Sequence, residues 1–132
     1  VDKAMFYQAS RGSGYNPLFT FPGHKKTKAY HGFRLFGEIY KLHHECRISC
    51  DNPDIYYAAA INESRSGMLI SNPTPHTQEA CIDFCGAELE DIIINLVDAD
   101  HDGDAVSVSS LDGLILPPHS VTLIIAKKRN KA

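Results

Sequence analysis

The pattern of apolar and polar residues changes near Cys46. Beyond this residue the apolar positions either alternate with polar ones or form short continuous runs, and both patterns are typical of β-strands. Turns rich in Pro, Gly, Asn and Asp separate the runs. The expected strands lie at residues 46–50, 54–62, 67–72, 78–85, 91–97, 104–108, 113–116 and 119–126. This spacing predicts a mainly β fold, an antiparallel β-sandwich of Greek-key type with about seven or eight strands.

The clearest strand pair lies between Asp54 and Asn72. A continuous apolar run, residues 55–61, is followed by a polar segment ending in Gly67 and by a second apolar run, residues 68–70. Two apolar runs joined by a short polar segment with glycine indicate a β-hairpin. We expect this hairpin to form the centre of the sandwich core.

A helical period precedes the strands, between Thr27 and His43. Thr27 is expected to cap the helix N-terminus. The apolar stripe of this helix consists of Ala29, Phe33, Phe36 and Tyr40, with Leu35 and Ile39 beside it. A helix cannot bury such a stripe alone, so we expect it to pack on the sandwich, on a body outside this chain, or on a second copy in an oligomer.

Residues 1–45 form the first expected unit, and residues 46–132 form the sandwich. The first unit contains a short apolar run within its first ten residues, consistent with a strand, and a Gly- and Pro-containing loop before the helix. Because the chain starts at Val1 and enters at once on an apolar segment, we expect it to be a piece of a longer protein.

Composition excludes several partners. The 132 residues suffice for one domain with a real hydrophobic core, and the formal net charge is −3. The single dense basic run, residues 127–131, follows the last expected strand and is typical of a solvated chain end, so we predict no nucleic-acid partner. No apolar run reaches the ~18 residues that a membrane-spanning helix needs, so we predict no membrane partner.

The four cysteines form two pairs, each with a spacing of four residues: Cys46 and Cys50, then Cys81 and Cys85. Zinc knuckles more often use a two-residue spacer, so the zinc signal is weak. We interpret the thiols as small buried side chains of a reduced protein, with disulfides between the two segments as the alternative in an oxidising compartment. The sequence leaves the compartment open, and free thiols favour the cytoplasm.

Two stretches resemble catalytic or metal-binding motifs. Asp98, Asp100 and Asp102 alternate before a glycine as in a calcium loop, but the twelfth position is Ser109 where such loops need Glu, so an acidic turn is the preferred interpretation. We expect no cofactor, with calcium as the alternative. Glu63 follows a strand as a glycosidase acid/base does, but the chain returns at once into the next strand, so we predict a turn residue and no catalytic residue.

Aromatic side chains on the surface could stack on sugar rings. The candidates are Tyr7, Tyr15, Tyr56 and Tyr57, and we expect at least one of Tyr56 and Tyr57 to lie in the core instead. A carbohydrate-binding module is therefore one possible function, and a calcium-dependent interaction module is another.

The order of several segments resembles the C-terminal region of clan-A glycoside hydrolases. These segments are MFYQAS (5–10), YNPLFTFPG (15–23), KTKAYHGFRLFGEIYKL (26–42), DIYYAAAINESRSGMLISN (54–72), INLVDADHD (94–102) and LILPPHSVTLIIA (114–126). The first three are similar to the last strand, loop and helix of the (β/α)8 catalytic barrel, and the others to the appended β-sandwich. The resemblance is to β-xylosidase-like and α-L-arabinofuranosidase-like enzymes and covers nearly the whole chain.

The resemblance implies that residues 1–45 are the remnant of the last barrel unit. In this family the two catalytic glutamates come from the fourth and seventh barrel strands, which would precede Val1, so no catalytic residue falls on this chain. The resemblance implies that the loop with Phe19 and Phe21, after the last barrel strand, borders the substrate cleft of a complete enzyme. With Tyr7 and Tyr15 from the surface aromatics, these are the carbohydrate-contact candidates. We expect a non-catalytic domain that braces the barrel of a parent xylosidase- or arabinosidase-like enzyme and meets carbohydrate only through it.

Overall fold

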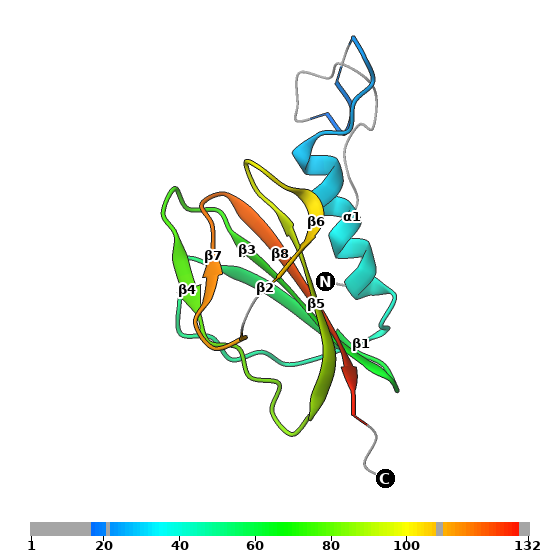
Figure 1. Cartoon of the computed structure of the whole chain (residues 1–132), viewed down its shortest axis with the longest axis vertical. Helices are drawn as coiled ribbons and strands as arrows, with labels where there is room; N and C mark the ends of the chain where they lie inside the picture. Colours follow the sequence, from blue (N-terminus) through cyan, green and yellow to red (C-terminus); the bar gives the residue numbers. More distant parts are fainter. Residues whose placement is uncertain (1–16, 21, 108–109, 130–132) are drawn as a thin grey trace.

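The computed structural model describes residues 17–20, 22–107 and 110–129, and these contain one α-helix and eight β-strands (Figure 1). The elements are α1 Lys28–Tyr40, β1 His44–Glu45, β2 Tyr56–Ile61, β3 Arg65–Asn72, β4 Gln78–Ala80, β5 Leu89–Val97, β6 Asp102–Val106, β7 Leu114–Leu116 and β8 Ser120–Lys128. The strand predicted within the first ten residues lies outside the described part of the chain.

Six strands form one antiparallel sheet in the order β1-β2-β3-β8-β5-β6, and β4 pairs with β7 in a second sheet. The predicted hairpin is confirmed, because Tyr56 of β2 pairs with Ser71 of β3 and Ile61 pairs with Ser66. Its expected place at the centre of the core holds only in part: Ala60 of β2 and Ile70 of β3 are buried in the two cores, but the start of β2 is exposed, and β8 lies between β3 and β5 in the sheet. Strand order depends on long-range pairing, which the apolar pattern does not encode.

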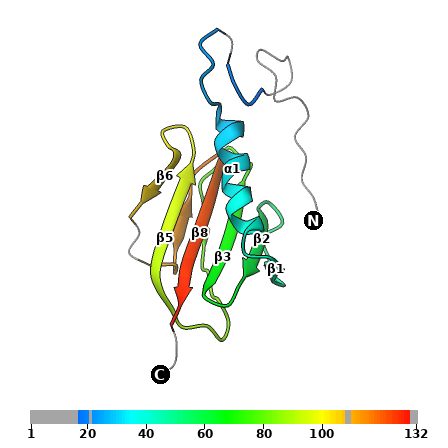
Figure 2. The same cartoon turned by 90° about the vertical axis from the view of Figure 1, so that its right-hand side faces the viewer.

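The helix α1 covers one face of the six-stranded sheet (Figure 2). The buried residues between helix and sheet are Leu35, Ile39, Leu42, Ala60, Val97 and Leu123. Gly67 of β3 permits the close approach, because a Cβ built there would lie 2.6 Å from Leu42 Cδ1 and 2.8 Å from Ile125 Cδ1. The side chains of the helix side therefore rest directly on the backbone of β3.

The second sheet covers part of the opposite face. The buried residues of this second core are Ile70, Ile94, Leu114, Leu116 and Ile124. Neighbouring residues of β8 pack into different cores, since Leu123 packs under the helix and Ile124 packs against the second sheet. The predicted antiparallel β-sandwich is confirmed, with α1 as a third layer.

Two predicted strands are wrong in extent. Residues 46–50 form no strand, because the chain leaves the sheet edge after β1, and only Gln78–Ala80 of the range 78–85 is a strand. In the antiparallel pair Ala80 faces Leu114, the first residue of β7, and the chain before Leu114 forms a turn in which Gly113 has a left-handed φ of 72°, so no strand faces residues 81–85. Ile82 and Phe84 nevertheless both pack on the second core, as their alternation predicts.

The ends of two other elements differ from their predicted ends. β8 continues to Lys128, so the first residues of the basic run belong to the strand, where Lys127 forms an ion pair with Asp91 at 2.7 Å. The helix begins as predicted, with Thr27 Oγ1 accepting a hydrogen bond from the Tyr30 N–H at 3.3 Å. It ends at Tyr40 instead of His43, since the chain turns there and His43 has a left-handed φ of 71°.

Candidate functional site

The helix α1 has a second apolar side that the sheet does not cover. The sheet buries Leu35 and Ile39, which flank the predicted stripe, whereas Phe33 and Tyr40 within the stripe keep 39% and 69% of their surface exposed. The predicted stripe therefore does not provide the main contact with the sandwich. A helix with apolar residues on two sides is typical of one that packs between two bodies.

Of the predicted carbohydrate contacts, only Phe19 lies in the described part of the chain. Tyr7, Tyr15 and Phe21 lie outside it. The Phe19 ring lies 5.5 Å from the Tyr30 ring, and the Phe19 backbone forms a bridge with Lys26. Phe19 thus supports the start of α1, and its ring is partly accessible.

The two tyrosines of β2 are both exposed, at 68% for Tyr56 and 41% for Tyr57. The expectation that one of them lies in the core was wrong, because β2 is the second strand from the sheet edge and the second sheet stops short of it. Neighbouring residues of a strand point to opposite faces, so the two rings cannot form one flat platform for a sugar.

Asp98 uses its carboxylate within its own turn. Its Oδ1 accepts hydrogen bonds from the N–H groups of Asp100 at 2.9 Å and His101 at 2.8 Å, and lies 2.8 Å from His101 Nδ1. Burial alone would raise the pKa of Asp98, but these hydrogen bonds together lower it below its usual value.

The other acidic groups of this loop are arranged differently. Asp102 pairs with Lys28 of α1 at 2.6 Å, which lowers the pKa of Asp102, while Asp100 is exposed. Within residues 17–20, 22–107 and 110–129, no group of three or more His, Cys, Asp or Glu side chains is placed to hold a metal ion. The loop thus connects the β5–β6 turn to the helix. The predicted acidic turn without a cofactor stays a prediction, with calcium as the alternative.

Asn62 and Glu63 form the turn between β2 and β3. Asn62 Oδ1 accepts hydrogen bonds from the N–H groups of Ser64 at 3.0 Å and Arg65 at 2.7 Å. Glu63 is exposed at this turn. The hydrogen bonds of Asn62 show that Asn62 and Glu63 belong to a tight turn, in which Asn side chains commonly bond the backbone.

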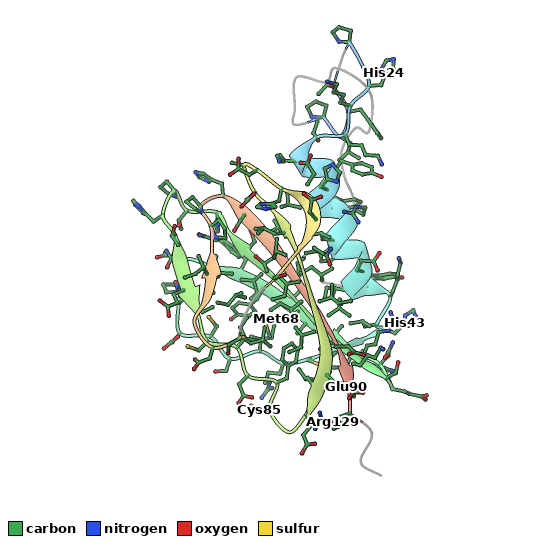
Figure 3. The ribbon with its side chains drawn as sticks, viewed as in Figure 1. His24, His43, Met68, Cys85, Glu90 and Arg129 are labelled. Carbon is green, nitrogen blue, oxygen red and sulfur yellow. The ribbon has the colours of Figure 1, made fainter. Side chains whose placement is uncertain are left out.

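A cleft of about 970 Å³ opens where the second sheet leaves the six-stranded sheet uncovered. Its floor includes Tyr57, Ala59, Met68 and Ile70 of β2 and β3. Its walls are residues 46–50, the first rim, and residues 80–88, the second rim. Figure 3 labels Met68 on the floor and Cys85 on the second rim.

All four cysteines line this cleft, two on each rim. Their thiols are free, as predicted, but not buried: Cys46 is half-buried, and Cys50, Cys81 and Cys85 are exposed. Sequence reasoning missed this convergence, because both rims lack the strand structure expected of them. The equal spacing within the two pairs was the only signal for it.

No helix in the described part of the chain combines the length and apolar character needed to cross a bilayer.

Comparison with known proteins places the fold. No protein-family model and no curated protein sequence matches the chain. A family 30 subfamily 8 xylanase from Clostridium acetobutylicum shares the fold with a TM-score of 0.67 at 11% identity, over 85% of this chain and 31% of the xylanase. A family 30 endoxylanase from Clostridium papyrosolvens matches with a TM-score of 0.62 at 13% identity, over 83% and 30%. A conserved exported protein from Bacteroides fragilis matches with a TM-score of 0.54 at 15% identity, over 61% and 18%.

The chain thus has a fold found within glycoside hydrolases of family 30. Since residues 46–132 are about two-thirds of the chain, a match over 85% also includes part of the first 45 residues. The chain spans less than a third of the length of each xylanase.

Proposed function

We propose that this chain is the non-catalytic C-terminal part of a glycoside hydrolase and braces a catalytic barrel in the parent protein. The fold match carries the proposal, because it extends over most of this chain but under a third of two xylanases. The finer proposal, a β-xylosidase-like or α-L-arabinofuranosidase-like parent, rests on the sequence resemblance of residues 5–126.

The outer side of α1 is the proposed contact with the barrel. Phe33 and Tyr40 lie on it, and Phe36 is half-buried beside them. Burying apolar surface stabilises a contact by about 25 cal/mol per Å², so the burial of two or three aromatic rings would stabilise the contact between α1 and the barrel. Because Ile39 of α1 and Leu42 just after the helix pack on Gly67 of β3, the helix would fix the orientation of the sandwich relative to the barrel.

Two measurements test this function. The coding sequence upstream of Val1 should continue in frame into a barrel with two glutamates at strand ends, and a stop codon or an unrelated domain there would refute the proposal. The purified chain should release no nitrophenol from aryl β-xylosides or aryl α-L-arabinofuranosides above the blank rate. Turnover by the chain alone, lost on substitution of one of its own carboxylates, would also refute it.

A sugar-binding function is the second proposal, since Tyr57 is 41% exposed and lines the cleft. Affinity electrophoresis in gels that contain xylan or arabinan distinguishes the two proposed functions. A domain that only braces the barrel should migrate as it does in a gel without polysaccharide. Retardation that disappears in Tyr57→Ala but not in Phe19→Ala would locate sugar binding in the cleft.

A further inference from the structure

The cleft brings together thiols that are far apart in the sequence. Cys46 and Cys50 lie on the first rim, and Cys81 and Cys85 lie on the second. Apart from Ala80, the last residue of β4, neither rim belongs to a strand, so few backbone hydrogen bonds hold either one in place. On the first rim the Cys46 N–H donates to the Ala59 carbonyl, and on the second the Ile82 N–H donates to the Leu111 carbonyl.

The first rim runs backwards along β2. Glu45 pairs with Ala60 near the end of β2, and the chain must return to Tyr56 to begin that strand. Residues 46–55 therefore pass from the end of β2 to its start.

The second rim runs the opposite way. It leaves β4 after Ala80 and ends at Leu89, which pairs with Lys128 next to the β3 residue Arg65. Since β2 ends where β3 begins, this is the same end of the sheet at which the first rim starts.

One hydrogen bond sets the offset between the two antiparallel rims. Asn52 Nδ2 donates to Gln78 Oε1 at 3.3 Å, two residues after Cys50 and three residues before Cys81. Counting two residues back along the first rim and two forward along the second brings Cys50 level with Ala80, the neighbour of Cys81. Four residues further on, Cys46 is level with Phe84, the neighbour of Cys85.

We propose that this cleft is a redox site in which a small disulfide oxidant joins the rims through Cys50 and Cys81, with Cys46 and Cys85 as the second link. The Cys50 thiolate attacks one sulfur of oxidised glutathione, forms a mixed disulfide and releases one glutathione, which takes up the proton that Cys50 lost. The Cys81 thiolate then attacks the Cys50 sulfur and releases the second glutathione. The protein loses two electrons and two protons, and the glutathione disulfide gains both.

The surroundings of the thiols set this order of attack. The Cys81 thiol donates a hydrogen bond to the Asp112 carboxylate, which raises the pKa of Cys81. Because the thiolate is the reactive form, Cys81 is suited to the second step, in which the mixed disulfide is already held beside it. A disulfide needs Cα atoms about 4.4 to 6.8 Å apart, so the link draws the rims together and narrows the cleft.

Peptide mapping tests the pairing. The purified chain is treated with oxidised glutathione, its remaining thiols are alkylated, and it is digested with trypsin without reduction. Cleavage at Lys and Arg places Cys46 in peptide 42–47, Cys50 in peptide 48–65, and both Cys81 and Cys85 in peptide 66–127. We expect peptide 48–65 linked to peptide 66–127, and further cleavage after Phe84 should leave Cys50 on the Cys81 side.

The unfolded chain provides the control. Loop closure favours short loops, so oxidation in urea should join Cys46 to Cys50 and Cys81 to Cys85. The same short-range pairing in the native protein, or only mixed disulfides with glutathione, would overturn the proposal. The Cys81→Ser variant should lose the 48–65 to 66–127 link, whereas Cys46→Ser should keep it.

Thermal unfolding tests closure of the cleft. A cross-link between the rims closes a loop of about thirty residues and should raise the melting temperature by on the order of 10 °C. The increase should disappear on reduction with dithiothreitol and be absent in Cys81→Ser. A linked protein with an unchanged or lower melting temperature would show that the rims do not meet in the native fold.

Discussion

Replacing Gly67 by alanine tests the closest contact between α1 and the sheet. The added Cβ would lie 2.6 Å from Leu42 Cδ1, 2.8 Å from Ile125 Cδ1 and 3.1 Å from Ile39 Cδ1, so at least two packed side chains must move. Overpacking of this kind costs about 1–3 kcal/mol. Alanine recovers roughly 0.5–1 kcal/mol of that cost, because glycine loses more backbone freedom on folding.

We therefore expect Gly67→Ala to lower the free energy of unfolding by about 1–2 kcal/mol, which corresponds to a melting temperature lower by roughly 4–8 °C. Urea unfolding followed by far-ultraviolet circular dichroism measures the change, with an unchanged slope as evidence that the unfolded state is not affected. A Gly67→Val variant should lose more, because its two further methyl groups enter the same contact.

Gly37 of α1 provides the matched control. A Cβ built there meets nothing within 4 Å, so Gly37→Ala should raise the free energy of unfolding by about 1 kcal/mol through helix propensity alone. Opposite signs for the two substitutions are the expected result. Equal stabilisation by both would refute the packing of α1 on the backbone of β3.

Other parts of the fold yield four further predictions. Asn72 is 1% exposed; its side-chain amide donates hydrogen bonds to three backbone carbonyls and accepts one from the Thr74 N–H. Asn72→Ala should therefore lower the free energy of unfolding in urea by about 3 kcal/mol, and a loss under 1 kcal/mol would contradict this. Leu35→Ala should cost about 2–5 kcal/mol and Tyr40→Ala under about 0.5 kcal/mol in the isolated chain, whereas similar losses would mean that both sides of α1 are covered. Folding lowers the pKa of Asp98, so its ionised carboxylate stabilises the fold at pH values above the usual pKa of 3.8. This stability is lost as the pH falls through the pKa that Asp98 has in the fold. The wild type should therefore lose more stability than Asp98→Asn between about pH 5 and pH 2. The hydroxyl of Thr122 is buried without a hydrogen-bond partner in the described part of the chain, so Thr122→Val should be neutral or stabilising by up to about 1 kcal/mol, and a clear loss would reveal a partner.

A calcium titration tests the loop that contains Asp98, Asp100 and Asp102. A ligand that binds the native state raises the melting temperature, so a calcium-dependent module should melt higher with millimolar calcium than with a chelator. With Asp98 bonded within its turn and Asp102 paired with Lys28, we expect equal melting temperatures. An increase that Asp98→Asn abolishes would establish calcium binding.

The apolar pattern of the helix was sufficient to place it, but not to orient it. Two sets of residues have the same helical period: the predicted aromatic stripe, and Leu35, Ile39 and Leu42. The sheet takes the aliphatic set, since Gly67 offers a surface without a side chain on which compact aliphatic groups fit closely. Period alone cannot choose between two apolar sides, because the choice depends on the shape of the partner surface.

The cleft could not be predicted for a related reason. The alternation in Cys81 to Cys85 does place Ile82 and Phe84 on the second core, but β7 is too short to hold this segment in a ladder. The two cysteine pairs line one cleft because their segments run in opposite directions past the same floor. That geometry follows from the pairing of β1 with β2 and of β5 with β8, in which Glu45 meets Ala60 and Leu89 meets Lys128, and a local apolar pattern does not encode such pairs.

The position of β8 also determines when this domain can fold during synthesis. β8 is the last strand of the described residues, yet it alone joins β3 to β5 in the sheet. Until Ser120–Lys128 has left the ribosome, the β2–β3 hairpin and the β5–β6 pair each present an open edge, and open edges pair readily with other chains. A ribosome that pauses, or a message cut short, before these nine residues therefore leaves the chain with two unjoined pieces of sheet that are prone to aggregate.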